Sequence, residues 1–304
     1  MVIRLGIVGV GKIVRDQHLP VLAVSGDFDL VAAASRNAMV EGLANFKTLE
    51  ALLAEGPEVD AVALCMPPQV RFAAAMTAIA AGKHVFLEKP PGAGLSEVAI
   101  LSEAAEAAGV TLFASWHSRH AAGVAEARRL LAERRVTGFA IAWKEDVRRW
   151  HPGQAWIWEP GGLGVFDSGI NALSIATEIL PGPLMLRASR LLFPAKRHAP
   201  IAAELTFGGI SGTAAFDWRQ TGPQTWDVAV ETEDGPVLLT RGGSRLSVDG
   251  KLGEAMPDRE YAGLYARFAA LIARNESDAD PRPLRLVADA FLLGERIETD
   301  NVNE

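Results

Sequence analysis

A lysine follows a short strand-like run at residues 84–87, within the sequence Glu88-Lys89-Pro90-Pro91. At the carboxyl end of a buried parallel strand, a side chain points into the crevice where α/β proteins bind their ligands. Burial in such a crevice generally lowers the pKa of a lysine, which then becomes usable as an acid or base near neutral pH. The alternative is a charged lysine in a surface turn, and the tetrapeptide alone does not separate the two.

Asp167 and Asn171 lie four residues apart in residues 163–179, a segment with helical spacing. Side chains four apart share one helix face, so a carboxylate and an amide would face the same ligand. Three glycines within residues 161–164 would let the backbone approach that ligand closely. Two plainer interpretations stay open: Asp167 caps the helix, or Asn171 is a buried amide with satisfied hydrogen bonds.

A glycine pair follows the first strand-like run, in the sequence GVGKIV at residues 9–14. Gly9 and Gly11 allow a tight turn, and they let backbone N–H groups approach a pyrophosphate at the start of the next helix. The third position of this dinucleotide fingerprint is Val14 instead of glycine or alanine, so the match is partial. A tight turn that binds nothing is the alternative.

The end of the second strand indicates which nicotinamide cofactor is used. An acidic residue there would bind the ribose 2′-hydroxyl of NAD, but the strand ends in Ser35-Arg36 and Asp29 lies at its start. A hydroxyl beside a guanidinium suits a 2′-phosphate, so we expect NADP to be accepted, with NAD as well. The alternative is that Arg36 is merely solvated.

The elements that must position these residues fall into two regions. In residues 1–117, short apolar runs alternate with segments of helical spacing. The runs lie at residues 4–8, 30–35, 59–64, 84–87 and 110–115, and the helical segments at 48–54, 71–81 and 96–108. This alternation predicts an α/β fold, an N-terminal Rossmann domain with a doubly wound parallel sheet.

The second region, residues 118–304, predicts a C-terminal α+β domain built on a mostly antiparallel sheet. About six strand candidates occupy residues 184–248, and a further one lies at 138–146. Helices are expected at 121–132, 163–179, 261–274 and 286–297, and a loop rich in Trp, Pro and Gly at 147–162.

Composition excludes several classes of protein. With 304 residues, 49% hydrophobic and 22% charged, the chain is typical of two globular domains. Its net charge of −7 argues against a nucleic-acid partner. No apolar stretch is long enough to span a membrane and no signal peptide is recognisable. A single cysteine, Cys65, is in keeping with a reducing compartment, so we expect a cytoplasmic enzyme.

The pairing of the glycine turn with Glu88-Lys89-Pro90 resembles the glucose–fructose oxidoreductase / inositol dehydrogenase (Gfo/Idh/MocA) family. The segment Cys65-Met66-Pro67-Pro68 lies where the family's sugar oxidoreductases have a proline turn beside the nicotinamide. Residues 143–171, WKEDVRRWHPGQAWIWEPGGLGVFDSGIN, look like the family's bacterial dehydrogenases of D-galactose and L-arabinose. The resemblance covers essentially the whole chain.

The resemblance implies an NAD(P)-dependent oxidation of the anomeric carbon of D-galactose or L-arabinose, which gives the aldonolactone. Lys89 takes the position of a proton-handling lysine, whereas Asp167 and Asn171 fall where many members have an Asp-x-x-x-His pair. Asn171 replaces that histidine, and an amide binds a hydroxyl but does not titrate near neutral pH. Proton removal then rests on Lys89 or Asp167. The family often forms homo-oligomers, which we expect here, and the resemblance implies that residues 118–304 are the substrate and oligomerisation domain.

The resemblance also implies the residues that surround the two ligands. Sugars present apolar C–H faces together with hydroxyl groups, so their sites combine indole rings with carboxylate and imidazole groups. Four tryptophans are expected in the core and not beside the sugar: Trp143, Trp156, Trp158 and Trp218. The expected cofactor-binding residues are Gly9, Gly11, Lys12, Ile13, Ser35, Arg36, Pro67, Glu88 and Lys89. The expected substrate-binding residues are Lys89, His117, Glu145, Trp150, His151, Asp167, Asn171 and Trp226.

Two other functions remain open. One is a family oxidoreductase that acts on another polyol, such as an inositol or a dihydrodiol, and the other is a sensor of sugar and nucleotide without enzymatic activity. Lys89 and Asp167 together favour an enzyme. No metal site is predicted, because the sequence has neither a Cys pair nor His-x-x-x-His spacing.

Overall fold

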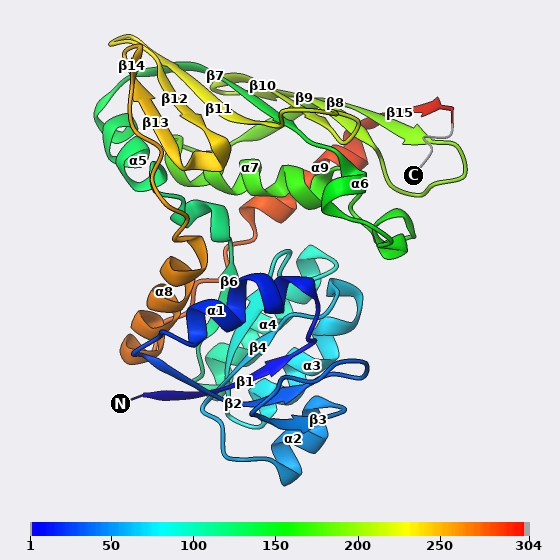
Figure 1. Ribbon diagram of the computed structural model, residues 1–304. Coiled ribbons are helices and arrows are strands. Elements are labelled where there is room, and N and C mark those ends of the chain that lie inside the picture. Colours follow the sequence, from blue (N-terminus) through cyan, green and yellow to red (C-terminus); the bar gives the residue numbers. More distant parts are fainter. Residues whose placement is uncertain (1, 301–304) are drawn as a thin grey trace. The chain divides into compact units, whose positions relative to one another are not determined.

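The structure, a computed structural model, describes residues 2–300 (Figure 1). The chain forms two compact units, one comprising Met1–His117 and Tyr261–Pro281, the other Ser118–Glu260 and Arg282–Glu304. The sequence assigned all of residues 118–304 to a second domain, but residues 261–281 pack within the first unit. The reason is that the apolar face of a helix in this segment is buried in the first unit's core.

The first unit is built on a six-stranded parallel sheet. Its strand order, β3-β2-β1-β4-β5-β6, is that of a doubly wound dinucleotide-binding fold, so the predicted α/β class is confirmed. The order reverses between β1 and β4, and ligands bind at the carboxyl ends of strands flanking such a point. The strands are β1 (Ile3–Val8), β2 (Phe28–Ala34), β3 (Ala44–Phe46), β4 (Ala61–Leu64), β5 (His84–Glu88) and β6 (Leu112–Ser115).

Helices cover both faces of this sheet, because successive strand side chains point to opposite faces. One core contains Leu5 and Ile7 of β1 and the buried face of α8, and the other contains side chains of α2, α3 and α4. The helical segments of the first unit are η1 (Val14–His18), α1 (Leu19–Leu22), α2 (Leu49–Glu55), α3 (Pro68–Ala80), α4 (Leu95–Ala108) and α8 (Glu260–Arg274).

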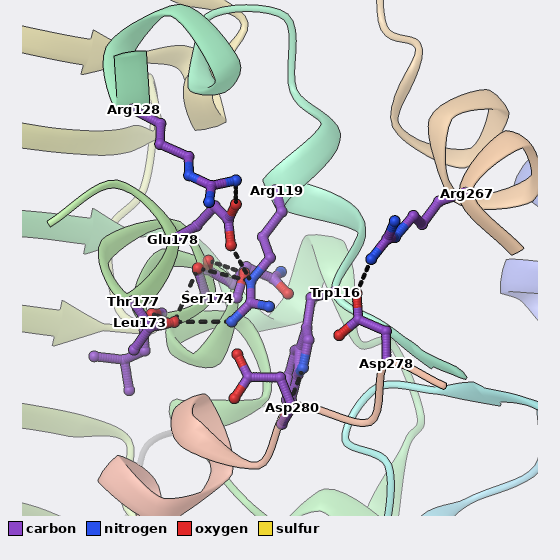
Figure 2. Close-up of polar contacts among 11 residues, drawn as sticks. Trp116, Arg119, Arg128, Leu173, Ser174, Thr177, Glu178, Arg267, Asp278 and Asp280 are labelled. Carbon is purple, nitrogen blue, oxygen red and sulfur yellow. Dashed lines mark hydrogen bonds and ion pairs between the residues drawn. The ribbon is translucent and has the colours of Figure 1, made fainter. Parts of the chain in front are cut away.

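Polar contacts bind the returning segment 261–281 to the rest of the first unit (Figure 2). The indole Nε1 of Trp116, directly after β6, donates a hydrogen bond of 2.9 Å to the carbonyl of Asp280. The backbone N–H of Ala114 on β6 donates to the carbonyl of Asp278 at 2.9 Å, and within the returning segment Arg267 on α8 forms a 3.0 Å ion pair with Asp278. These contacts, together with the buried face of α8, explain why a segment so late in the sequence belongs to the first unit.

The second unit is built on a nine-stranded sheet of order β14-β13-β12-β11-β7-β10-β9-β8-β15. It is mostly antiparallel, as predicted; the parallel pairs are β7–β10 and β8–β15. Helices α5 (Val124–Glu133), α7 (Phe166–Ile179) and α9 (Arg282–Leu293) lie along one face (Figure 1). The strands are β7 (Val136–Lys144), β8 (Met185–Pro194), β9 (Ala202–Gly208), β10 (Ser211–Asp217), β11 (Thr225–Thr232), β12 (Val237–Thr240), β13 (Arg245–Val248), β14 (Lys251–Leu252) and β15 (Gly294–Thr299).

The predicted helix at residues 286–297 is only partly correct. The helix, α9, ends at Leu293, and the chain continues as β15, which pairs with β8 along its whole length. Leu292 and Leu293 are exposed, so the buried stripe of the helix ends before them. Gly294 is a poor helix residue, and the unpaired backbone groups of β8 give the extended chain a full set of hydrogen bonds.

Candidate active site

The turn after β1 has the geometry of a dinucleotide-binding loop. Gly9 has a φ of +89°, and a Cβ on it would lie 2.7 Å from the backbone nitrogen of Met66, so only glycine fits. A Cβ on Gly11 would meet nothing within 4 Å, which leaves open space beside the turn. Residues 12–22 are helical, so the unpaired N–H groups of the first helical turn lie next to that space. These residues fit the pyrophosphate of a dinucleotide.

Of the remaining residues predicted for this loop, Lys12 and Ile13 form the first exposed positions of the helix. The ammonium of Lys12 pairs with Asp16, one turn further along. Pro67 is the residue before α3, in the turn that follows β4, and Met66 of that turn packs against Gly9. The turns after β1 and β4 therefore meet at the point where the strand order reverses.

Ser35 and Arg36 follow the carboxyl end of β2, whereas Asp29 lies exposed near its amino end. The backbone N–H of Ser35 donates to the carbonyl of Phe46 on β3, at 2.9 Å. Arg36 is exposed, and within residues 2–300 its guanidinium has no ion-pair partner. A guanidinium in this place is available for a phosphate group.

Lys89 directly follows β5, and the carboxylate of Glu88 lies buried behind it. The Oε2 atom of Glu88 accepts the backbone N–H of Lys89 at 2.8 Å. Its Oε1 atom accepts the hydroxyl of Tyr261 on α8 at 2.8 Å and lies 3.0 Å from Nε2 of His18. Glu88 was predicted to bind the cofactor. In the described part of the chain, its carboxylate makes hydrogen bonds to other residues of the first unit.

His18 is fully buried, and its Nδ1 atom lies 2.7 Å from the hydroxyl of Tyr265. Burial works against a charged imidazole, but Cys65, Tyr265 and Glu88 raise the pKa of His18 well above its ordinary value. Burial would also raise the pKa of Glu88, yet hydrogen bonds and the charge of His18 hold it at about 2. Burial raises the pKa of Tyr265 to about 12. The sequence left His18 unassigned, and nothing in its spacing indicated this network.

His117, at the end of the same unit, stacks on the ring of Tyr261 with centroids 5.6 Å apart. It is half-buried, and its charge also favours the ionised form of Glu88. His84, expected to be structural, accepts the backbone N–H of Thr111 through Nδ1, at 2.9 Å.

In the second unit, an imidazole lies between two buried carboxylates. The Nε2 atom of His151 is 3.7 Å from Oδ2 of Asp167 and 3.9 Å from Oε1 of Glu145. Asp167 is in the first turn of α7, Glu145 directly follows β7, and both are at least nine-tenths buried. The sequence predicted these three residues, and the structure brings them together.

Trp218 supports this cluster, although the sequence predicted only a core role for it. Its ring packs against the imidazole of His151, with centroids 4.9 Å apart. The indole Nε1 donates a 2.8 Å hydrogen bond to the hydroxyl of Ser168, the neighbour of Asp167 on α7. Trp218 therefore fixes both the ring plane of His151 and the first turn of α7.

Two further tryptophans extend the cluster toward solvent. The indole Nε1 of Trp226, on β11, donates to Oε2 of Glu145 at 2.9 Å. Burial raises the pKa of Glu145, and this hydrogen bond and the charge of His151 oppose the shift. Trp150 packs edge-on against Trp226, with centroids 5.5 Å apart, and is 38% exposed. Both rings line a groove that also includes Gln224.

Asn171 lies one turn after Asp167 on α7 and is half-buried. Its amide makes no hydrogen bond to another residue within residues 2–300. The residue at the amino-terminal cap of α7 is Val165, whose side chain makes no capping hydrogen bond, and Asp167 lies in the first turn of the helix.

The glycines before α7 have a packing role that the sequence did not predict. A Cβ on Gly162 would lie 2.4 Å from the carbonyl oxygen of Ile157, and one on Gly164 would lie 2.3 Å from that of Pro200. These glycines allow close approach of the chain's own backbone, which fixes the entry into α7.

Helix α7 is bound from the side by a group of polar contacts (Figure 2). Arg119 donates from Nε to the carbonyl of Ser174 at 3.1 Å and from Nη2 to the hydroxyl of Thr177 at 3.0 Å. Glu178 forms a 2.7 Å ion pair with Arg128 of α5 and lies 3.8 Å from Arg119. The helix that carries Asp167 and Asn171 is thus fixed along its length within its own unit.

Residues 2–300 contain no group of three or more His, Cys, Asp or Glu side chains arranged to hold a metal ion. In the same range, no helix combines the length and apolar character that crossing a membrane requires.

Residues 3–115 match the model of the Gfo/Idh/MocA family, described as an oxidoreductase family with an NAD-binding Rossmann fold. The galactose 1-dehydrogenase of Pseudomonas fluorescens is 44% identical over 301 residues, which cover 98% of both chains. The chain therefore belongs to the Gfo/Idh/MocA family, and it is an oxidoreductase that uses a nicotinamide cofactor.

Solved structures agree with this assignment. A D-galactose-1-dehydrogenase from Rhizobium etli is 55% identical, with a TM-score of 0.95, over 99% of this chain and 98% of that one. KijD10, a 3-ketoreductase from Actinomadura kijaniata crystallised with NADP, is 20% identical, with a TM-score of 0.82, over 98% of this chain and all of that one. At that identity, the second match shows the fold alone.

Proposed function

We propose that the protein is an aldose 1-dehydrogenase that oxidises the anomeric carbon of D-galactose and L-arabinose to the aldonolactone. The observation that carries the proposal is the imidazole of His151 between the carboxylates of Asp167 and Glu145, with indole rings beside it. Such a set can bind several sugar hydroxyls and one apolar face of the ring. The identity to two galactose 1-dehydrogenases along nearly the whole chain supports this substrate class.

The turn after β1, Ser35 and Arg36 would hold the dinucleotide, which supplies the acceptor for the hydride that leaves C1. Oxidation also removes the proton of the anomeric hydroxyl, and the chain must accept it. We assign this step to Lys89 or Asp167. Asn171 is assigned a binding role: its unpaired amide can donate to or accept from a hydroxyl, but it does not take up a proton.

The remaining polar residues are assigned to hold the sugar. Glu145 and His151 would hydrogen-bond hydroxyl groups, and His117 is assigned the same role. Trp150 and Trp226 would contact the C–H face of the ring, since an indole offers both an apolar plane and a polar edge. D-galactose and L-arabinose as pyranoses share their hydroxyl geometry and differ by a hydroxymethyl group, against which a pocket discriminates weakly.

Three further points belong to the proposal. NADP is used well and NAD also, because Arg36 is free to bind a 2′-phosphate where an acidic residue would favour NAD. The enzyme works in the cytoplasm. It forms a homo-oligomer through the face of the nine-stranded sheet that α5, α7 and α9 leave uncovered, and light scattering of the purified protein tests this.

The proposed function is tested by following NADH and NADPH absorbance with a panel of aldoses, inositols and dihydrodiols. We expect reduction with D-galactose and L-arabinose. Lys89→Ala should lower turnover by about 10²-fold or more. Lys83→Ala is the matched control, because Lys83 immediately precedes the opposite end of the same strand. Reduction with inositols alone, or cofactor binding without any reduction, would overturn the proposal.

A further inference from the structure

Three turns meet at the carboxyl edge of the first unit's sheet, because β1, β4 and β5 are neighbours in it. The turn after β1 contains Gly9, the turn after β4 contains Met66, and the turn after β5 contains Lys89. Gly9 and Met66 touch through their backbones. A buried arginine joins the second turn to the third.

Arg71 lies in the first turn of α3 and is 2% exposed. Its Nε atom donates to the carbonyl of Met66 at 3.1 Å, and Nη2 donates to the same carbonyl. Its Nη1 atom donates to the carbonyls of Glu88 and Pro90, the residues on either side of Lys89. A buried guanidinium needs such partners, since an unpaired charge would be strongly destabilising.

We propose that Arg71 is a positioning residue for Lys89. Its guanidinium fixes the carbonyls that flank Lys89, while the carboxylate of Glu88 accepts the backbone N–H of Lys89 itself. Through Met66, the same guanidinium holds the turn that we assign to the nicotinamide. The inference rests on the proposed function, because the proton-handling role of Lys89 is part of that function.

The planar guanidinium of Arg71 makes a set of hydrogen bonds that the ammonium of a lysine does not make. Guanidinium presents donors from three nitrogens in one rigid plane, whereas an ammonium presents them from a single point. Arg71→Lys keeps the charge but loses the bridge between the Met66 carbonyl and the two carbonyls beside Lys89. Arg71→Met removes the charge as well and serves as the second variant.

The first measurement is hydrogen exchange in the protein without ligands, over peptides that cover residues 65–68 and 88–91. We expect both peptides to lose protection in Arg71→Lys. The matched control is Arg4→Lys, since Arg4 also uses its fork, on Asp60, but at the amino end of β1. Its substitution should leave both peptides as protected as in the parent protein.

The second measurement is steady-state kinetics with D-galactose and its 1-deuterated form. A misplaced Lys89 should lower kcat about tenfold or more, with little change in the KM for sugar, and raise the isotope effect on kcat. A smaller fraction of folded enzyme would lower kcat but leave the isotope effect unchanged.

Loss of protection together with a lower kcat and a larger isotope effect supports the inference. Unchanged exchange in both Arg71 variants overturns it, and so does lost protection with unchanged kcat. If Arg71→Met does not fold, Arg71→Lys alone decides. If the parent protein oxidises no aldose, the proposed function fails, and the exchange comparison then decides whether Arg71 holds the Lys89 turn.

Discussion

Replacing Glu88 by glutamine should destabilise the first unit in a manner that depends on pH. The carboxylate is buried against His18 and Tyr261, and its pKa falls from 4.5 in the unfolded chain to about 2 in the fold. One pKa unit corresponds to about 1.4 kcal/mol, so the ionised carboxylate contributes about 3 kcal/mol near neutral pH. Glutamine retains the shape of the side chain but loses this contribution.

The way in which stability changes with pH follows from the direction of each pKa shift. A carboxyl whose pKa is lowered on folding stabilises the protein above its unfolded pKa, and this stability is lost as the pH falls toward the folded value. The difference between parent and Glu88→Gln should thus fall to about 2 kcal/mol at about pH 3.5 and to less than about 1 kcal/mol at about pH 2.5. The pKa of His18 is raised, so its contribution is complete below about pH 6.5 and is lost as the pH rises through the folded value. The difference in stability between the parent protein and Glu88→Gln is therefore largest between the unfolded pKa of Glu88 and the folded pKa of His18.

Hydrogen exchange of the β5 amides measures this difference within the first unit, after correction for the intrinsic exchange rate at each pH. Glu97→Gln is the control, because Glu97 accepts a single backbone N–H from Ala93 in the same unit. Its substitution should change the opening free energy little at any pH. An effect of Glu88→Gln that stays below about 1 kcal/mol near neutral pH, or that is the same at about pH 2.5, would show that the ionised carboxylate does not stabilise the first unit.

Three substitutions test other parts of the account. Trp226→Phe removes the donor to Glu145 and should raise the KM for galactose roughly tenfold, since a hydrogen bond to a charged group contributes about 1.5 kcal/mol or more. Arg36→Ala should lower kcat/KM for NADP at least about tenfold more than for NAD, because only NADP carries the 2′-phosphate. Gly164→Ala should lower the unfolding free energy by more than about 1 kcal/mol in thermal unfolding, because φ is +53° and the new Cβ meets the Pro200 carbonyl.

Each of these has a comparison within the same chain. Trp156→Phe should leave the KM for galactose unchanged, since its indole makes no hydrogen bond within residues 2–300; an equal rise would contradict the role of Trp226. NAD is the internal standard for Arg36, and equal losses with both cofactors would remove Arg36 from phosphate binding. Gly222→Ala has a positive φ but no close neighbour, so an effect as large as that of Gly164→Ala would exclude the clash.

The fold could be predicted where the spacing of apolar residues agrees with the burial of the element that they form. The strands of the first unit are short apolar runs buried on both faces, and that pattern gave them directly. The destination of α8 could not be predicted, because an amphipathic face shows that a helix is buried but not on which sheet. The strand β15 was missed for a similar reason: its hydrogen bonds come from the edge of β8, about a hundred residues earlier.

The candidate site shows the same division. The residue types and positions of Lys89 and Asp167 indicated a role, whereas His151 and Glu145 were selected by the resemblance to the family. His18 meets Tyr265 across 247 positions, and Arg71 binds carbonyl groups that every residue possesses, so no local pattern could reveal either one. Supporting residues such as His18 and Arg71 can be recognised only in the folded structure, where segments distant in the sequence lie close together.

In the proposed reaction hydride leaves C1 of the sugar, and deuterium placed at that carbon tests this step directly. With D-galactose deuterated at C1 and NADP, we expect the label to appear in the reduced nicotinamide and the product to be the unlabelled galactonolactone. Deuterium retained in the oxidised sugar would show that another carbon reacts and that the protein is not a 1-dehydrogenase.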